Sequence, residues 1–192
     1  LIKTNPNFLK AIISRVILFS AFLMLWAYFQ KFFVDLGVPI IILGVAWGAH
    51  HFFVFIANWF SKQIKLYSSI QSTINIFNLI ISALLACFIA MWFFWPQKYV
   101  LLFIFCLMFI MNNIRDPFYS ELYHKMSASF NRATTISMTM FFKSLLDIPI
   151  LFFGSFLVAK STIYPYFLTL AIALAVILFF RIPKNFEQLK SW

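Results

Sequence analysis

Long apolar runs repeat along the whole chain, and only short polar segments separate them. Each of six runs reaches or approaches the roughly 20 residues that a helix needs to cross a bilayer. We expect spans at about 11–34, 38–60, 74–95, 99–115, 133–159 and 163–180. This pattern predicts an all-α membrane protein whose six transmembrane helices form one bundle over residues 11–182.

Composition supports a membrane protein over a soluble domain. Hydrophobic residues make up 64% of the chain and charged residues only 10%, whereas roughly a quarter of the residues in a soluble domain are charged. The net charge of +10 is compatible with a nucleic-acid or a membrane partner. Because most Lys and Arg lie between the apolar runs and form no cluster, we expect contact with anionic membrane lipids and none with nucleic acid.

The distribution of basic residues predicts the orientation. Three lie at one end of the expected bundle, namely Lys31, Lys98 and Lys160, and Lys143 lies within a span. Eleven lie at the other end: Lys3, Lys10, Arg15, Lys62, Lys65, Arg115, Lys125, Arg132, Arg181, Lys184 and Lys190. We therefore expect both termini in the cytoplasm, which requires an even number of spans, and we expect the cytoplasmic membrane of a bacterium.

The links between the spans differ in length. Residues 35–37, 96–98 and 160–162 form very short links, which predict antiparallel neighbours. Residues 61–73 and 116–132 form longer, polar links. The second is either an ordinary loop or a short interfacial helix. The apolar side of that helix would consist of Tyr119, Leu122, Tyr123 and Met126.

A polar stripe crosses the fifth apolar run. Thr135, Thr139, Lys143 and Asp147 recur every four residues and share one face of a helix. Charges at that depth usually face protein or water and often mark function, so we expect this stripe to bind substrate or carry protons. The alternative is an ion pair within the helix that only neutralises itself. Pro149 removes a backbone donor and is a candidate hinge or a static bend.

Other polar residues within the spans are further candidates for the substrate or proton pathway. His50 and His51 lie near the centre of the second run, about 100° apart on a helix. One of them can face a cavity; the alternative is a His that hydrogen-bonds to a neighbouring helix. Gly44 and Gly48 form a GxxxG pattern, which we expect to pack inside the protein.

The ends of the spans hold the remaining candidates. Tyr28 and Gln30 are candidates for contact with substrate or for an outer gate, with interfacial anchoring as the alternative for Tyr28. Near the cytoplasmic ends, Asn112 and Asn113 are candidates for the pathway, and Arg115 and Arg132 for a gate. A solvated helix end is the alternative for the residues near 115.

Motifs for enzymatic chemistry are missing from the sequence. It contains no Gly-rich phosphate loop, no Ser/His/Asp set and no metal-ligand spacing, and the five acidic residues are scattered. We therefore expect no enzyme activity, no cofactor and no metal site.

Two segments resemble the major facilitator superfamily. Residues 28–44 resemble its seventh helix and following turn, and Arg132–Ser137 (RATTIS) resembles the Arg-Ala-Thr-x-x-Ser entry to its eleventh helix. The basic Gly-Asp-Arg loop typical of the N-terminal half is missing from residues 58–65, which read NWFSKQIK. The matching residues of the first segment are Tyr28, Gln30, Phe32, Phe33, Gly37, Pro39 and Gly44.

The resemblance implies the C-terminal six-helix half of a secondary transporter. Residues 1–10 would end the central cytoplasmic linker, and residues 183–192 would form a cytoplasmic tail. A missing N-terminal half would complete a central cavity, and a small molecule would cross by alternating access. Because the sequence begins at Leu1 and not at Met, we expect a fragment.

Proton coupling is a further hypothesis that rests on Asp147 and the two histidines. A non-transporting six-helix scaffold or assembly protein is one alternative function. A half-size transporter that dimerises to complete its cavity is another.

Overall fold

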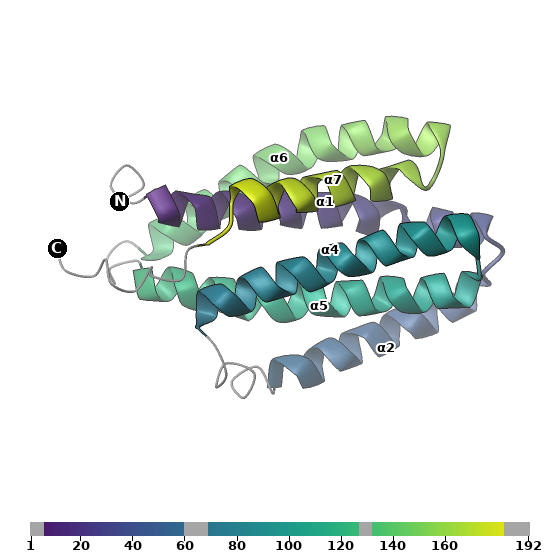
Figure 1. Ribbon diagram of the computed structural model, residues 1–192, viewed down its shortest axis with the longest axis horizontal. Coiled ribbons are helices and arrows are strands. Elements are labelled where there is room, and N and C mark those ends of the chain that lie inside the picture. Colours follow the sequence, from purple (N-terminus) through teal and green to yellow (C-terminus); the bar gives the residue numbers. More distant parts are fainter. Residues whose placement is uncertain (1–5, 60–68, 127–131, 183–192) are drawn as a thin grey trace.

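Six α-helices make up the part of the chain that the computed structural model describes, residues 6–59, 69–126 and 132–182. They are α1 (Pro6–Asp35), α2 (Ile40–Trp59), α4 (Ile70–Phe94), α5 (Lys98–Met126), α6 (Arg132–Lys160) and α7 (Tyr164–Phe179). The helices run side by side, and α1 begins at the end of the bundle where α7 ends (Figure 1). The all-α class predicted from the apolar runs is confirmed.

Within the described residues, five of the helices, α1, α2, α4, α5 and α6, are long and apolar enough to cross a membrane. The sixth, α7, is apolar but has only 16 residues, a length of about 24 Å at 1.5 Å per residue. That is shorter than the roughly 30 Å hydrocarbon core of a bilayer. The structure therefore supports a membrane protein with five candidate spans, and a crossing by α7 stays a prediction.

The connections at the end of the bundle opposite the start of α1 are tight. Gly37 has φ +75°, a left-handed conformation that glycine adopts at little cost. It lets the chain reverse between α1 and α2, and the Lys98 ammonium donates to its carbonyl oxygen at 2.7 Å. At the other end of the bundle, Ser69 caps α4 by accepting a hydrogen bond from the Ser72 N–H at 3.3 Å.

The fourth helix is longer than predicted. Helix α5 continues through Pro117 to Met126, so the expected loop or separate short helix is wrong as far as residue 126. The place where the fourth span leaves the membrane stays a prediction. Residues 127–131 lie outside the described part. The side chains of Tyr119, Leu122 and Tyr123 are buried in a core cluster with residues of α1 and α4. Apolar packing against these helices explains why a segment with a polar composition remains part of the bundle.

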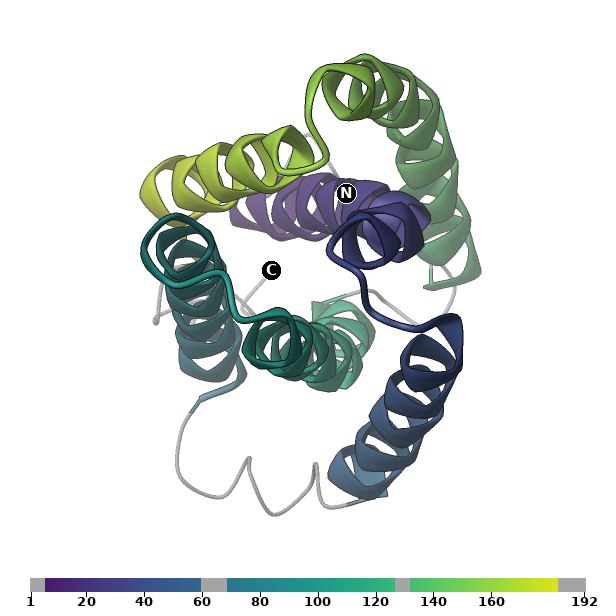
Figure 2. The ribbon, with the colours of Figure 1, turned by 90° about the vertical axis from the view of Figure 1, so that its right-hand side faces the viewer.

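The order of packing only partly follows the order of the chain. Helices α4 and α5, joined by a short link, pack closely as predicted. The main partners of α1 are α6 and α7, whereas α2 packs mainly on α5. Viewed from the end, α2 and α6 stand on the side of the bundle away from α4 and α7, with α1 and α5 between them (Figure 2).

The glycines that allow close packing are not the predicted ones. A Cβ added at Gly44 or Gly48 would meet no described atom within 4 Å, so the expected internal packing of this GxxxG pattern is wrong for this chain. At Gly154 on α6 a Cβ would lie 2.7 Å from Met24 Cγ and 3.0 Å from Tyr28 Cε2. Gly154 is therefore the residue that lets α1 and α6 approach closely.

Candidate functional site

A charged network joins α6 to α1. Lys143 Nζ lies 3.4 Å from Asp147 Oδ2, one turn further along α6. The Ser20 hydroxyl on α1 donates a 2.6 Å hydrogen bond to Asp147 Oδ1. The Lys143 and Asp147 side chains are 26% and 15% exposed, so both charges are largely withdrawn from the surface and lie against α1.

A second ion pair lies near the first. Arg15 Nε on α1 is 3.3 Å from Asp116 Oδ1 on α5, and the Arg15 guanidinium lies 5.2 Å from the centre of the Tyr123 ring. A small cavity of about 90 Å³ separates the two pairs. Its lining consists of Arg15, Val16, Phe19, Asp116, Thr139, Met140 and Lys143.

These residues form one site, which we call the charged network: Arg15, Ser20, Asp116, Thr139, Lys143 and Asp147. Its two cations and two carboxylates form two ion pairs and come from three helices, so their formal charges cancel. A proton or a charged ligand that enters the cavity would change the balance of both pairs, because electrostatic interactions are strong where water is excluded.

The predicted polar stripe on α6 is only partly described. Thr139, Lys143 and Asp147 share the face that contacts α1, and Thr139 is buried. The side chains of Thr135 and Arg132 lie outside the described residues. Helix α6 continues through Pro149, and the hinge stays a prediction.

The two histidines have different surroundings. His50 is buried and stacks on Trp47, with ring centres 4.5 Å apart, and its Nδ1 has no hydrogen-bond partner among the described residues. His51 is exposed. No group of three His, Cys, Asp or Glu side chains suitable for a metal occurs in the described part of the chain.

The predicted residues near the ends of the spans fall into two groups. Tyr28 donates to the Leu151 carbonyl oxygen at 3.1 Å and so ties α1 to α6, whereas Gln30 is exposed. Asn113 hydrogen-bonds to the Phe109 carbonyl of its own helix at 2.8 Å.

Arg115 is buried inside the bundle, only 1% exposed, so a solvated helix end is wrong for this residue. Its guanidinium donates to Asn78 Oδ1 at 2.6 Å and to Asn112 Oδ1 at 2.7 Å. These bonds join α4 to α5. Asn112 is therefore held by Arg115 and is buried with it.

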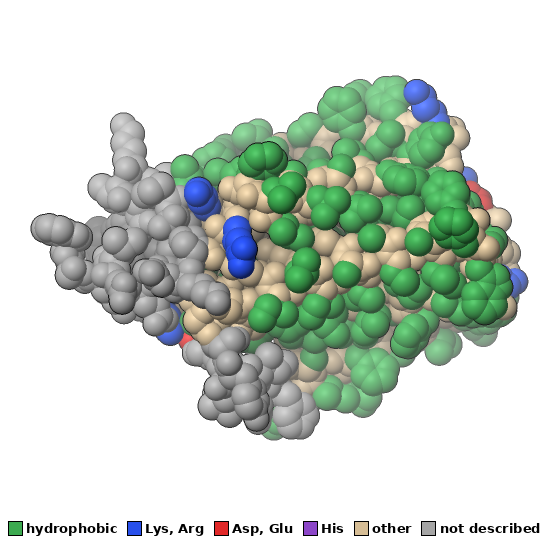
Figure 3. Space-filling model, in the orientation of Figure 1, with side chains coloured by type: hydrophobic (Ala, Val, Ile, Leu, Met, Phe, Trp, Pro, Cys, Tyr) green, Lys and Arg blue, Asp and Glu red, His purple; other side chains and the backbone are tan. Residues whose placement is uncertain are grey.

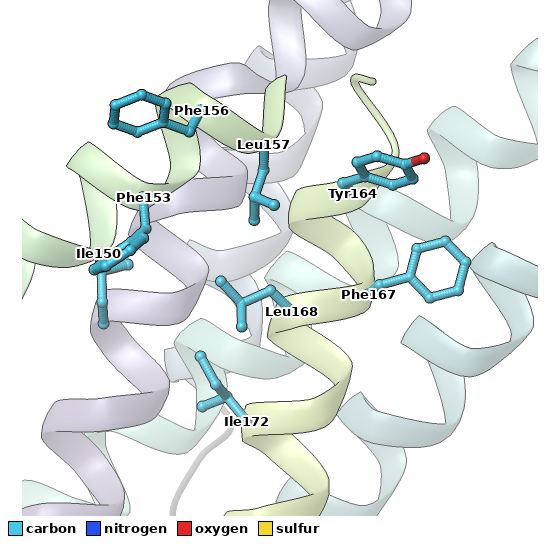
Figure 4. Close-up of a pocket in the computed structure, with 8 residues that line it drawn as sticks. All are labelled: Ile150, Phe153, Phe156, Leu157, Tyr164, Phe167, Leu168 and Ile172. Carbon is cyan, nitrogen blue, oxygen red and sulfur yellow. The ribbon is translucent and has the colours of Figure 1, made fainter. Parts of the chain in front are cut away.

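A much larger groove than the cavity of the charged network lies elsewhere and is almost entirely apolar. It has a volume of about 790 Å³ and lies between α6 and α7 (Figure 4). Among the side chains that line it, only Tyr164 carries a polar atom. The lining is Ile150, Phe153, Phe156, Leu157, Tyr164, Phe167, Leu168 and Ile172. Such a surface suits lipid chains and offers few groups to orient a polar substrate.

Sequence reasoning missed half of the charged network. Arg15 and Asp116 were expected in a cytoplasmic flank and a link, and Ser20 was not singled out. Asn78, a partner of Arg115, was also missed, although an amide inside an apolar run is itself a signal for a polar contact. Pairing between helices depends on the three-dimensional packing, and spacing within one helix does not reveal it. No protein-family model, characterised protein or solved structure matches the chain.

Proposed function

We propose that the chain is the C-terminal six-helix half of a secondary transporter of the major facilitator type, moving a small molecule by alternating access. The observation that carries the proposal is the charged network between α1 and α6. Lys143 and Asp147 lie 11 and 15 residues into a helix of 29 residues, about 17 and 23 Å from its start. In this fold class, substrate and coupling-ion sites lie near the bilayer midplane.

A purely stabilising role is a weaker explanation of the network. The attraction within a partly buried ion pair is offset by the cost of removing its charges from water, which is several kcal/mol per ion. Helix α1 or α6 with apolar residues at these positions would pack at lower cost. A role in transport would explain the four charges on three helices, because their pairing would change as the transporter alternates between its two open states.

The exposed surfaces of α2 and α6 support the need for a second half. In each of these helices only 11% of the most apolar 18-residue window is buried, against 39–56% in α1, α4 and α5. Helix α1 also has an exposed stripe, the open face, which consists of Trp26, Ala27, Gln30 and Val34. We propose that a second six-helix half covers α2 and α6 and encloses an aqueous cavity over the open face.

Uptake or export in intact cells tests the proposal. Cells that express the native reading frame are screened with a panel of labelled metabolites and lipophilic drugs, and the flux of any transported compound is then compared in two variants. Asp147→Asn breaks the ion pair between Lys143 and Asp147. Asp35→Asn is the matched control, because Lys31 and Asp35 form an exposed pair with the same order and spacing, 3.1 Å apart.

We expect Asp147→Asn to lower flux at least tenfold and Asp35→Asn to leave it unchanged. If proton coupling is also correct, the remaining flux of Asp147→Asn no longer depends on the pH gradient. Equal flux in both variants would remove the network from the mechanism. The absence of flux for every compound with the unmodified protein would favour the scaffold alternative.

A further inference from the structure

A polar groove lies between the first turns of α4 and the last turns of α7. It has a volume of about 320 Å³ and is separate from the charged network. Its polar lining consists of Ser72, Asn75, Asn78 and Arg181, and its apolar lining of Ile76, Leu79, Val176 and Ile177. One cation, three polar side chains and an apolar wall therefore meet in one place.

The end of α7 is fixed at this groove by side-chain bonds. Asn75 Nδ2 donates to the Ile182 carbonyl oxygen at 2.8 Å, and the Ile182 N–H donates to Asn75 Oδ1 at 3.3 Å. Ile182 is itself buried. The residue beside Arg181 is thereby anchored to α4, which keeps the Arg181 guanidinium at the groove.

Arg181, just after the end of the shorter helix α7, lies beside the first turns of α4. Helix α7 has 16 residues and α4 has 25, or about 24 and 38 Å. Where α7 ends, α4 continues toward the end of the bundle that carries the start of α1 (Figure 1). An arginine near one end of an apolar bundle, next to apolar side chains, is well placed to meet a lipid phosphate.

A buried cation lies behind the groove. Asn78 is 6% exposed, and its Oδ1 accepts the 2.6 Å hydrogen bond from Arg115. That bond uses the Oδ1 atom of Asn78, and its amide NH₂ group remains able to donate. No carboxylate of the described residues lies within 4.0 Å of the Arg115 guanidinium, which is held by two neutral amides. The charge of Arg115 therefore favours an anion at Asn78.

The surroundings of the groove point to a lipid rather than a soluble anion. Ile76 and Leu79 are 51% and 59% exposed beside the polar residues. Hydrophobic side chains cover the surface seen in Figure 3, and Lys and Arg appear only toward the two ends of that surface. A soluble anion would make no favourable contact with these apolar side chains, whereas the acyl chains of a lipid would pack along them.

We propose that this groove binds the phosphate group of an anionic phospholipid. The Arg181 guanidinium and the Asn78 amide would donate to phosphate oxygens, with the Ser72 hydroxyl near the entrance. Charge-assisted hydrogen bonds to phosphate are stronger than hydrogen bonds between neutral groups. The acyl chains would pack on Ile76, Leu79 and Val176. This proposal requires a membrane protein but not a transporter, so it stands or fails independently of the proposed function.

Retention of phosphatidylglycerol tests the proposal. The purified protein is placed in phosphatidylcholine nanodiscs with increasing phosphatidylglycerol, and the bound anionic lipid is counted by native mass spectrometry. Arg181→Gln removes the groove cation. Lys10→Gln is the matched control, because Lys10 is an exposed cation near the start of α1 and does not line the groove. Equal melting temperatures in pure phosphatidylcholine verify that both variants fold.

We expect Arg181→Gln to weaken phosphatidylglycerol binding about fivefold, the effect of one cation at a lipid surface, and Lys10→Gln to change it less than twofold. Ser72→Ala should weaken binding in the same direction without changing the charge. Equal losses in Arg181→Gln and Lys10→Gln would show general attraction to anionic lipid and overturn the site. Competition by soluble glycerol phosphate as strong as that by the lipid would overturn the lipid assignment.

Discussion

Ser20 on α1 donates a 2.6 Å hydrogen bond to Asp147 on α6. The same carboxylate pairs with Lys143 at 3.4 Å, so Asp147 connects a contact within one helix to a contact between two. A hydrogen bond to a charged group contributes more than one between neutral groups. Ser20 therefore controls how firmly the intramembrane carboxylate is held.

Removing the Ser20 hydroxyl should weaken the contact between α1 and α6. We expect Ser20→Ala to lower the free energy of unfolding by about 1.5–3 kcal/mol, measured by thermal unfolding in detergent. Ser155→Ala is the control, because Ser155 is exposed and its hydroxyl bonds only to the Phe152 carbonyl of its own helix. Equal effects of the two substitutions would contradict an energetically important Ser20–Asp147 bond.

Arg115 should not tolerate replacement by lysine. Its guanidinium holds the Asn78 and Asn112 oxygens at once, and a single ammonium cannot reproduce this planar geometry. We expect Arg115→Lys to cost about 1–3 kcal/mol of unfolding free energy, because a buried amide loses its partner. Arg181→Lys, at an exposed position, should cost far less. A melting temperature of Arg115→Lys that equals that of Arg181→Lys would refute the role of the bidentate contact.

Two glycines should respond in opposite directions. Gly154→Ala would bring a methyl group to 2.7 Å from Met24 Cγ, so we expect it to destabilise the bundle by about 1–3 kcal/mol. Gly48→Ala meets no described atom within 4 Å, and alanine is the better helix former by about 0.5–1 kcal/mol. Thermal unfolding of the two variants compares these effects directly. A stabilising Gly154→Ala would show that α1 and α6 are not in close contact.

Two buried tyrosines offer a similar comparison. The Tyr166 hydroxyl is buried and has no hydrogen-bond partner among the described residues, whereas the Tyr119 hydroxyl lies 2.7 Å from Ser14 Oγ. We expect Tyr166→Phe to leave stability unchanged or raise it, because an unpaired buried hydroxyl is costly. Tyr119→Phe should lower the free energy of unfolding by about 1 kcal/mol. The reverse order of melting temperatures would contradict these assignments.

The sequence predicts the helices well because a bilayer requires long apolar segments, and five of the six expected spans are helices long and apolar enough to cross it. It predicts Lys143 and Asp147 as a pair because four residues bring two side chains together on a helix. The end of α5 was missed because Arg115 and Asp116 are polar, and their partners Asn78 and Arg15 come from other helices. The spacing of Gly44 and Gly48 was misleading, because the same pattern suits an exposed helix face.

Access of water to the open face tests the central claim most directly. Ala27 on α1 and Cys87 on α4 are both exposed and lie about 12 and 11 Å from the same end of the bundle, counted from Asp35 and Phe94. Two proteins are compared in intact cells with a charged, membrane-impermeant thiol reagent. One carries Ala27→Cys with Cys87→Ala and Cys106→Ala, and the other carries only Cys106→Ala.

A transporter half predicts rapid labelling of the cysteine at position 27 and slow labelling of Cys87, because the open face would line an aqueous cavity and α4 would face lipid. Equally slow labelling at both positions would contradict a cavity over the open face.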